Sequence, residues 1–287
     1  MCSSDLAWRA LNFLVSRLET GTQLKLYLVD ISFDELSAGL MADGAIESTG
    51  IYKLLVENTV ETFGGEPWAV LVGNYFFDFN AKDAEVLNRL SIVADNAIAP
   101  FVAGATSRVV GCESLWEDPR DWNLESDVES KMAWDDLRRI STARYLGLAL
   151  PRFLLRLPYG SETEAAEEFS FEEMPDAPDE QHQSYLWANP AFAVAYLLSE
   201  AYLQSGWELR PGECQEIEGL PIHVYKADGE TQIKPCAEVT MNVRVAEKII
   251  DRGVMPLITI KDTGTVRLGM FQSLALPATN LSGRWTG

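Results

Sequence analysis

The stretch YLGLALPRFLLRLPYG, residues 145–160, is strongly apolar but is interrupted by two arginines and two prolines. An arginine at the centre of a membrane-spanning helix costs roughly 2.5–3.5 kcal/mol, and this stretch would place both Arg152 and Arg156 there. Pro151 would break the helix between them, and the apolar run is shorter than the ~20 residues that a span requires. The stretch is therefore not a transmembrane segment.

The apolar residues of this stretch change sides at Pro151. Before the proline the large apolar residues have even numbers and after it they have odd numbers: Leu146, Leu148 and Leu150, then Phe153, Leu155 and Leu157. Because successive side chains of a strand point to opposite faces, this parity predicts a core strand with a bend or bulge at the proline. Arg152 and Arg156 share one face of its second half, where each needs a carboxylate or carbonyl partner. That partner lies either in the same chain or in another subunit, and the pattern favours neither.

Helix and strand patterns alternate on both sides of this stretch. Helical patterns cover residues 6–20, 46–62, 81–97, 127–142, 191–203 and 243–252, and Asn189-Pro190 provides a cap and a first turn for the fifth of these. Strand patterns cover residues 24–32, 68–77, 101–105, 221–225, 238–242, 256–260 and 266–271. This alternation predicts an α/β or mixed α+β fold.

Composition divides the chain into three regions. Residues 1–160 form a first α/β core region, and residues 185–287 form a second part of the core. Between them, residues 161–184 are rich in Asp and Glu and contain no Lys or Arg. Such a segment cannot bury much apolar surface, so it is predicted to be a solvated loop or linker.

The charge balance excludes whole classes of partner. The 287 residues include 43 Asp and Glu but 23 Lys and Arg, which gives a formal charge of −20. This field repels phosphate backbones and anionic membrane surfaces, so neither nucleic acid nor a membrane is an expected partner. The four cysteines are scattered without a CxxC pair, as is usual for reduced thiols, and the first residues show no secretory signal.

The sequence carries no recognisable catalytic, cofactor-binding or metal-binding motif. It has only two histidines, His182 in the acidic segment and His223 in an apolar strand pattern. Cys112 has no neighbouring basic residue that would lower its pKa, so a packing role is favoured over a nucleophilic one. The Gly64-Gly65 pair could hold an anion, but a tight turn is favoured. These observations predict that the chain is not an enzyme.

Several segments, taken together and in order, resemble the large subunit of the type VI secretion contractile sheath. They run from about Ala7 to Ser273: AWRALNFLVSRLETGTQLKL, ETFGGEPWAVLVGNYFF, APFVAGATSRVVG, ARYLGLALPRFLLRLPYG, EEFSFEE, YLWANPAFAVAYLL, EGLPIHVY and GVMPLITIKDTGTVRLGMFQS. The resemblance implies a phage-tail-sheath-like core and a structural protein without cofactors in the bacterial cytoplasm. The implied partners are the small sheath subunit, neighbouring sheath subunits, the inner tube protein, a Clp-class recycling ATPase and the baseplate.

Within the matching segments, the candidate structural or interface residues are Trp8, Arg9, Arg144, Arg152, Arg156 and Tyr159. Members of the family usually extend beyond the counterparts of Trp8 and Ser273, so we expect a chain truncated at both ends or a divergent core. The leading hypothesis is a sheath subunit that assembles with the small subunit. The alternatives are an accessory binding module that does not polymerise and, as a different class, a small-molecule enzyme on an α/β scaffold.

Overall fold

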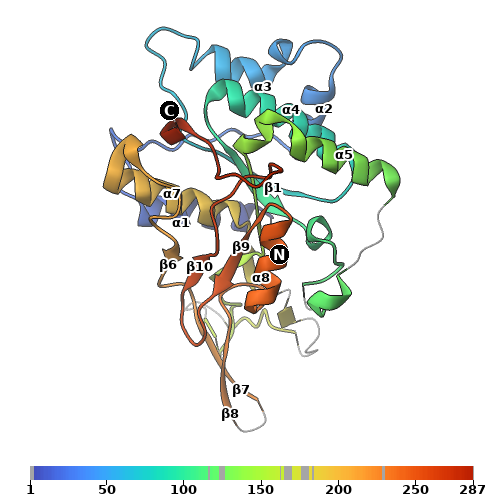
Figure 1. Cartoon of the computed structure of the whole chain (residues 1–287). Coiled ribbons are helices and arrows are strands. Elements are labelled where there is room, and N and C mark those ends of the chain that lie inside the picture. Colours follow the sequence, from blue (N-terminus) through green and yellow to red (C-terminus); the bar gives the residue numbers. More distant parts are fainter. Residues whose placement is uncertain are drawn as a thin grey trace.

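The computed structural model describes residues 3–115, 117–122, 127–161, 163–164, 170–175, 181–182, 184–227 and 230–286. At its centre lies a six-stranded sheet in the order β1-β2-β3-β9-β10-β6 (Figure 1). Four neighbouring strands are parallel: β1 (Leu71–Phe77), β2 (Phe101–Ala105), β3 (Leu146–Leu150) and β9 (Val254–Thr259). Two short antiparallel strands complete it, β10 (Val266–Leu268) and β6 (Glu216–Ile217). The predicted mixed α/β fold is confirmed, and one sheet takes strands from both core regions.

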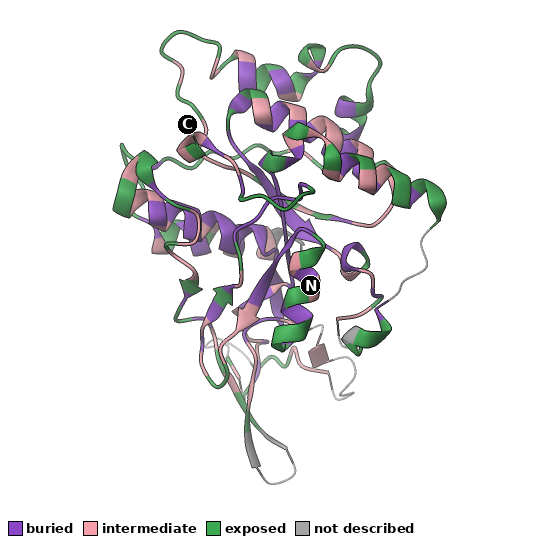
Figure 2. Ribbon diagram, in the orientation of Figure 1, coloured by how far each residue is buried: buried purple, intermediate pink, exposed green. Residues whose placement is uncertain are grey.

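Helices cover both faces of the sheet, as parallel strands require. One core contains residues from α2 (Phe33–Met41), α4 (Ala81–Ala97), α5 (Val128–Arg139) and α8 (Val243–Asp251). The opposite core contains residues from α1 (Ser3–Arg17) and α7 (Ala191–Ser205). Figure 2 shows the central strands and much of α7 as buried. Among the described residues, every helix falls short of the length and hydrophobicity needed to cross a membrane.

Short helical turns connect these elements. They are 3₁₀ helices at Ile46–Ser48, Ser107–Val110, Pro119–Asp121, Ser141–Tyr145, Gly206–Glu208 and Arg284–Thr286, the single turn α3 (Gly50–Tyr52) and a π-helical turn at Lys53–Glu57. The helix predicted over residues 46–62 is therefore three short turns that end at Glu57. In contrast, the helix predicted over residues 81–97 coincides with α4.

The chain leaves the central sheet at Pro151, as the change of parity predicts. The three leucines of β3 pack into the core beneath α4, whereas Phe153 packs into the core beneath α7. Residues Phe153–Arg156 form β4, which pairs with β5 (Leu186–Ala188) in a separate two-stranded sheet. The parity rule fails at Leu157, which joins a third cluster with Leu154. A shift of register between Leu154 and Arg156 accounts for this exception, because a bulge changes the face of the following residues.

Two predicted strands are wrong. Residues 24–32 have a strand pattern, but the structure leaves them without a strand assignment. Residues 238–242 also lie outside the strands: Glu238 donates one backbone hydrogen bond to the carbonyl of Arg152, and Asn242 caps α8. A strand needs a ladder of backbone hydrogen bonds. Among the described residues, none bonds by its backbone to residues 25–30, and next to residues 238–242 only an isolated bridge joins Ala237 to Phe153 of β4.

The N-cap residue of α7 is Pro190, one position after the predicted Asn189, but the Asn189 side chain still bonds to the first residue of the helix and has a second contact. Its Oδ1 accepts the N–H of Ala191 at 2.9 Å, and its Nδ2 donates to the carbonyl of Tyr75 at 2.7 Å. The Asn189 side chain therefore ties the start of α7 to β1.

At the other end of the molecule, β7 (His223–Ala227) and β8 (Glu230–Lys234) form a hairpin that projects from the body (Figure 1).

Candidate assembly site

A buried arginine joins the end of β4 to the acidic segment. The side chain of Arg156 is 3% exposed, and its Nη1 donates to Oε2 of Glu173 at 2.8 Å and to the carbonyl of Leu157 at 2.7 Å. Its Nη2 donates to the other carboxylate oxygen at 3.3 Å. Burial opposes the charge of Arg156, but its bonds with Glu173 outweigh burial and raise the pKa of the arginine. Burial likewise opposes the charge of Glu173, yet the bonds from Arg156 and from the Tyr159 N–H lower the pKa of that carboxyl.

The N-terminal helix is tied to the same cluster. The guanidinium carbon of Arg156 lies 4.1 Å from the centre of the Tyr159 ring. Arg9 of α1 donates from Nη2 to the Tyr159 hydroxyl at 2.8 Å and from Nε to Oδ1 of Asp5 at 3.0 Å. These contacts connect α1, β4 and residue 173, which are distant in sequence. We name Asp5, Arg9, Arg156, Tyr159 and Glu173 the Arg156 cluster.

Arg152 belongs to a second ion pair. Its Nε and Nη2 donate to the two carboxylate oxygens of Glu238 at 2.9 and 2.5 Å, a bidentate geometry that strengthens such pairs. His182 Nε2 lies 3.5 Å from Oε1 of the same carboxylate. Burial on its own would raise the pKa of Glu238, but the hydrogen bonds from Arg152 and His182 outweigh it and lower the pKa to about 2.

Replacing Glu238 by glutamine should remove a pH-dependent part of the stability. The folded-state pKa of Glu238 is about 2 and its ordinary value is 4.5, so the carboxylate stabilises the fold above pH 4.5 and loses this effect as the pH falls towards 2. At 1.36 kcal/mol per pKa unit, the full effect is about 3 kcal/mol. We therefore expect Glu238→Gln to be less stable than the unsubstituted chain by about this amount at pH 7. Urea unfolding at several pH values measures the difference, and a gap that stays constant between pH 5 and 3 would contradict the assignment.

The structure brings some of the predicted site residues together and separates others. Arg9, Arg156 and Tyr159 share the Arg156 cluster, and Trp8 lies beside it with 59% of its surface exposed. Arg144 stands apart: its side chain is 52% exposed, with Nη2 3.4 Å from Asp95. Thus both arginines of the opening stretch have carboxylate partners within the chain. Sequence reasoning missed the partners Glu173 and Glu238, because no local pattern links residues so far apart. It also missed Asp5, although the spacing of four residues between Asp5 and Arg9 is a local helical signal.

Comparison with known proteins decides the family. The family model described as "EvpB/VC_A0108, tail sheath N-terminal domain" matches residues 4–275. The chain belongs to the type VI secretion sheath large-subunit family. It is also 36% identical over 282 residues to the type VI secretion system sheath protein TssC1 of Pseudomonas aeruginosa. The match covers 96% of this chain and 56% of that protein, so the chain spans about half the length of this relative.

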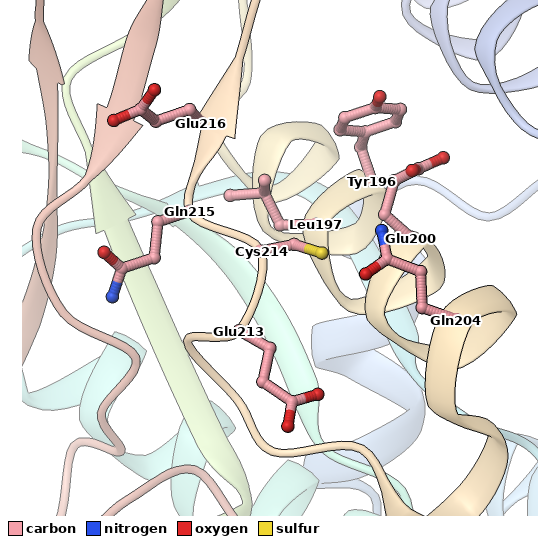
Figure 3. A pocket seen from close by; sticks show the side chains of 8 residues that line it. All are labelled: Tyr196, Leu197, Glu200, Gln204, Glu213, Cys214, Gln215 and Glu216. Atoms are coloured by element: carbon pink, nitrogen blue, oxygen red, sulfur yellow. The ribbon is translucent and has the colours of Figure 1, made fainter.

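The sheath family is a family of structural proteins and not of enzymes. One hollow, of about 410 Å³, lies between α7 and the residues that lead into β6 (Figure 3). Glu200, Glu213 and Glu216 line it together with Cys214, and burial followed by the charges of Glu200 and Glu213 raises the pKa of this thiol. A thiol held protonated is a poor nucleophile.

The two cysteines that are buried in the described part of the chain are also held as thiols. Burial, with the charges of Glu117 and Glu113, raises the pKa of Cys112 to about 12, and burial raises that of Cys236 to about 11. Cys112 is part of the first core, so the predicted packing role is confirmed. Within the described ranges, no group of three or more Cys, His, Asp or Glu side chains could hold a metal ion.

Proposed function

We propose that this chain is the core of a sheath subunit that pairs with a small sheath subunit and stacks with neighbouring subunits around an inner tube. Contraction of the sheath then drives the tube outward. The observation that carries the proposal is the family match over residues 4–275, which includes all six strands of the central sheet. A Clp-class ATPase that recycles the sheath, the baseplate and a cytoplasmic location belong to the same proposal.

The ionic clusters support a structural role. Assembly and contraction transmit force through the subunit, so elements that are distant in sequence must stay connected. The Arg156 cluster connects α1 with β4, and the pair of Arg152 and Glu238 connects the bend after β3 with the chain before α8.

We propose that Trp8, exposed beside the Arg156 cluster, and the half-exposed Arg144 contact other subunits. We also propose residues 161–184 as a linker between the regions 1–160 and 185–287; residues 162, 165–169, 176–180 and 183 lie outside the described residues.

Co-expression with the small sheath subunit from the same gene cluster tests the proposal. We expect a stable heterodimer on size-exclusion chromatography, or tubes by negative-stain electron microscopy. The chain alone is the control: at a formal charge of −20, copies of it should repel one another at low ionic strength and remain monomeric. The absence of both heterodimer and tubes would contradict an assembling role. A heterodimer that blocks the growth of tubes would instead indicate a binding module that does not polymerise.

A further inference from the structure

Residues 25–30, Lys-Leu-Tyr-Leu-Val-Asp, form an extended segment that is exposed along its whole length. Four consecutive large apolar side chains in it are exposed by 41, 59, 68 and 46%: Leu26, Tyr27, Leu28 and Val29. Single exposed apolar residues are ordinary, but a continuous group of them marks a surface that another molecule covers. Apolar side chains on both faces are typical of a strand inside a sheet.

The backbone of this segment has no ladder partner. Among the residues that the structure describes, none forms a backbone–backbone hydrogen bond with residues 25–30. The sequence nevertheless has the composition of a strand, since Leu, Tyr and Val dominate it. When a segment strongly prefers strand structure but the surrounding fold offers it no pairing strand, a neighbouring strand is missing.

Contacts on one side hold the segment in place and leave the other side open. The ring of Tyr27 packs edge-on against Trp68 at 5.2 Å, and its hydroxyl donates to Glu66 at 3.0 Å. Beyond the segment, the Tyr75 hydroxyl of β1 donates to the carbonyl of Ile31 at 2.7 Å. In an extended chain the N–H and C=O of one residue point to the same edge, and those of the next residue point to the opposite edge. The edge of Ile31 and Val29 therefore faces β1, and the edge of Leu28 faces outward.

We propose that residues 25–30 are a docking strand, and that an extended strand of a second, different polypeptide pairs with the edge carrying Leu26, Leu28 and Asp30. Main-chain hydrogen bonds would supply the affinity, and the exposed apolar side chains would supply the specificity. Because its two ends are already fixed, the segment loses little freedom on binding. This inference rests on the proposed function, since it identifies where a sheath partner binds.

Charge decides against a second copy of this chain as the occupant. Residues 19–35 contain four acidic side chains (Glu19, Asp30, Asp34 and Glu35) and the single basic side chain Lys25, and each copy carries a formal charge of −20. Four acidic side chains against one basic side chain give residues 19–35 a net negative charge, so two copies would repel each other as they approach. The fitting occupant is a strand flanked by Lys or Arg side chains.

A pair of proline variants tests the inference, with the purified small sheath subunit as the probe. Leu28→Pro removes an N–H from the open edge, and Val29→Pro removes one from the edge that faces β1. Neither N–H is bonded within the described chain, and an extended backbone suits proline. Both variants should therefore unfold at the same urea concentration as the unsubstituted chain. We expect Leu28→Pro to weaken binding by about ten-fold or more, as the loss of a strand pairing should, while Val29→Pro binds like the unsubstituted chain. Leu28→Thr keeps the N–H and should lose less affinity than Leu28→Pro.

The possible outcomes separate this inference from the proposed function. If the unsubstituted chain binds the small subunit and both proline variants bind equally, strong or weak, the docking strand is wrong while the proposed function stands. If only Val29→Pro lost affinity for the small subunit, the assignment of the open edge to Leu28 would be wrong. If the unsubstituted chain does not bind at all, both proposals fail. If sedimentation shows that the chain self-associates through residues 25–30, a second copy occupies the docking strand and the proposed partner, a different polypeptide, is wrong.

Discussion

Replacing Arg156 by methionine is expected to lower the free energy of unfolding by about 3–5 kcal/mol, the effect of removing one partner of a buried ion pair. The side chain is 3% exposed and binds both oxygens of Glu173. Methionine fills a similar volume but leaves the Glu173 carboxylate half-buried without its cation. It also removes the ring contact with Tyr159. Urea unfolding followed by circular dichroism at pH 7 measures the change.

Arg144→Met is the matched control. This arginine also faces a carboxylate, but its side chain is 52% exposed, so the same substitution should cost less than about 1 kcal/mol. The double variant Arg156→Met/Glu173→Met should recover much of the loss, because it removes both charges together. Equal effects of Arg156→Met and Arg144→Met would show that burial does not determine the strength of the Arg156 cluster.

Replacing Phe153 by alanine is expected to cost about 3–5 kcal/mol, as large-to-small substitutions of buried aromatic residues do. Phe153 is fully buried at the first position of β4, and its ring lies 5.3 Å from that of Phe13 in α1. Its removal leaves a cavity where α1, β4 and α7 meet, and also removes the edge-to-face ring contact. Thermal and urea unfolding both measure this loss.

Phe63→Ala provides the control for the same change of side chain. Phe63 is fully exposed, so its replacement should change the stability by about 0.5 kcal/mol or less. If Phe153→Ala lowered the stability as little as Phe63→Ala does, α1 would not be packed on β4 as described. If Phe153→Ala does not fold, the smaller change Phe153→Leu should give a folded protein of intermediate stability.

The fold class could be predicted from the sequence because the central strands have strong local patterns. Residues 101–105 and 146–150 are continuous apolar runs, and both are parallel strands of the sheet. The predicted signal at Asn189 also acts locally, within two residues of the N–H that its side chain binds. By contrast, residues 24–32 have the pattern of a strand but pair with no strand in the described part of the chain. A helix satisfies its backbone hydrogen bonds internally, whereas a strand needs a neighbouring strand.

The candidate site could be predicted only in part. The sequence identified Arg152 and Arg156 as arginines that need partners, because both lie in an apolar stretch. It could not choose among the many carboxylates, since Glu173 lies 17 residues from Arg156 and Glu238 lies 86 residues from Arg152. The exposure of residues 25–30 could not be predicted from the sequence either, because it depends on which residues the rest of the folded chain covers.

The sequence by itself therefore determined the alternation of helices and strands, the change of sides at Pro151, the absence of a membrane span in the opening stretch and the resemblance to the sheath family. Each of these depends on residues that are close together or on their order along the chain. Only the tertiary structure decided that Arg156 and Arg152 bind carboxylates of their own chain, and that residues 25–30 have no backbone partner among the described residues. The physical reason is that ion pairs and strand ladders join residues that are distant in sequence, and their partners are fixed only when the chain packs around both cores.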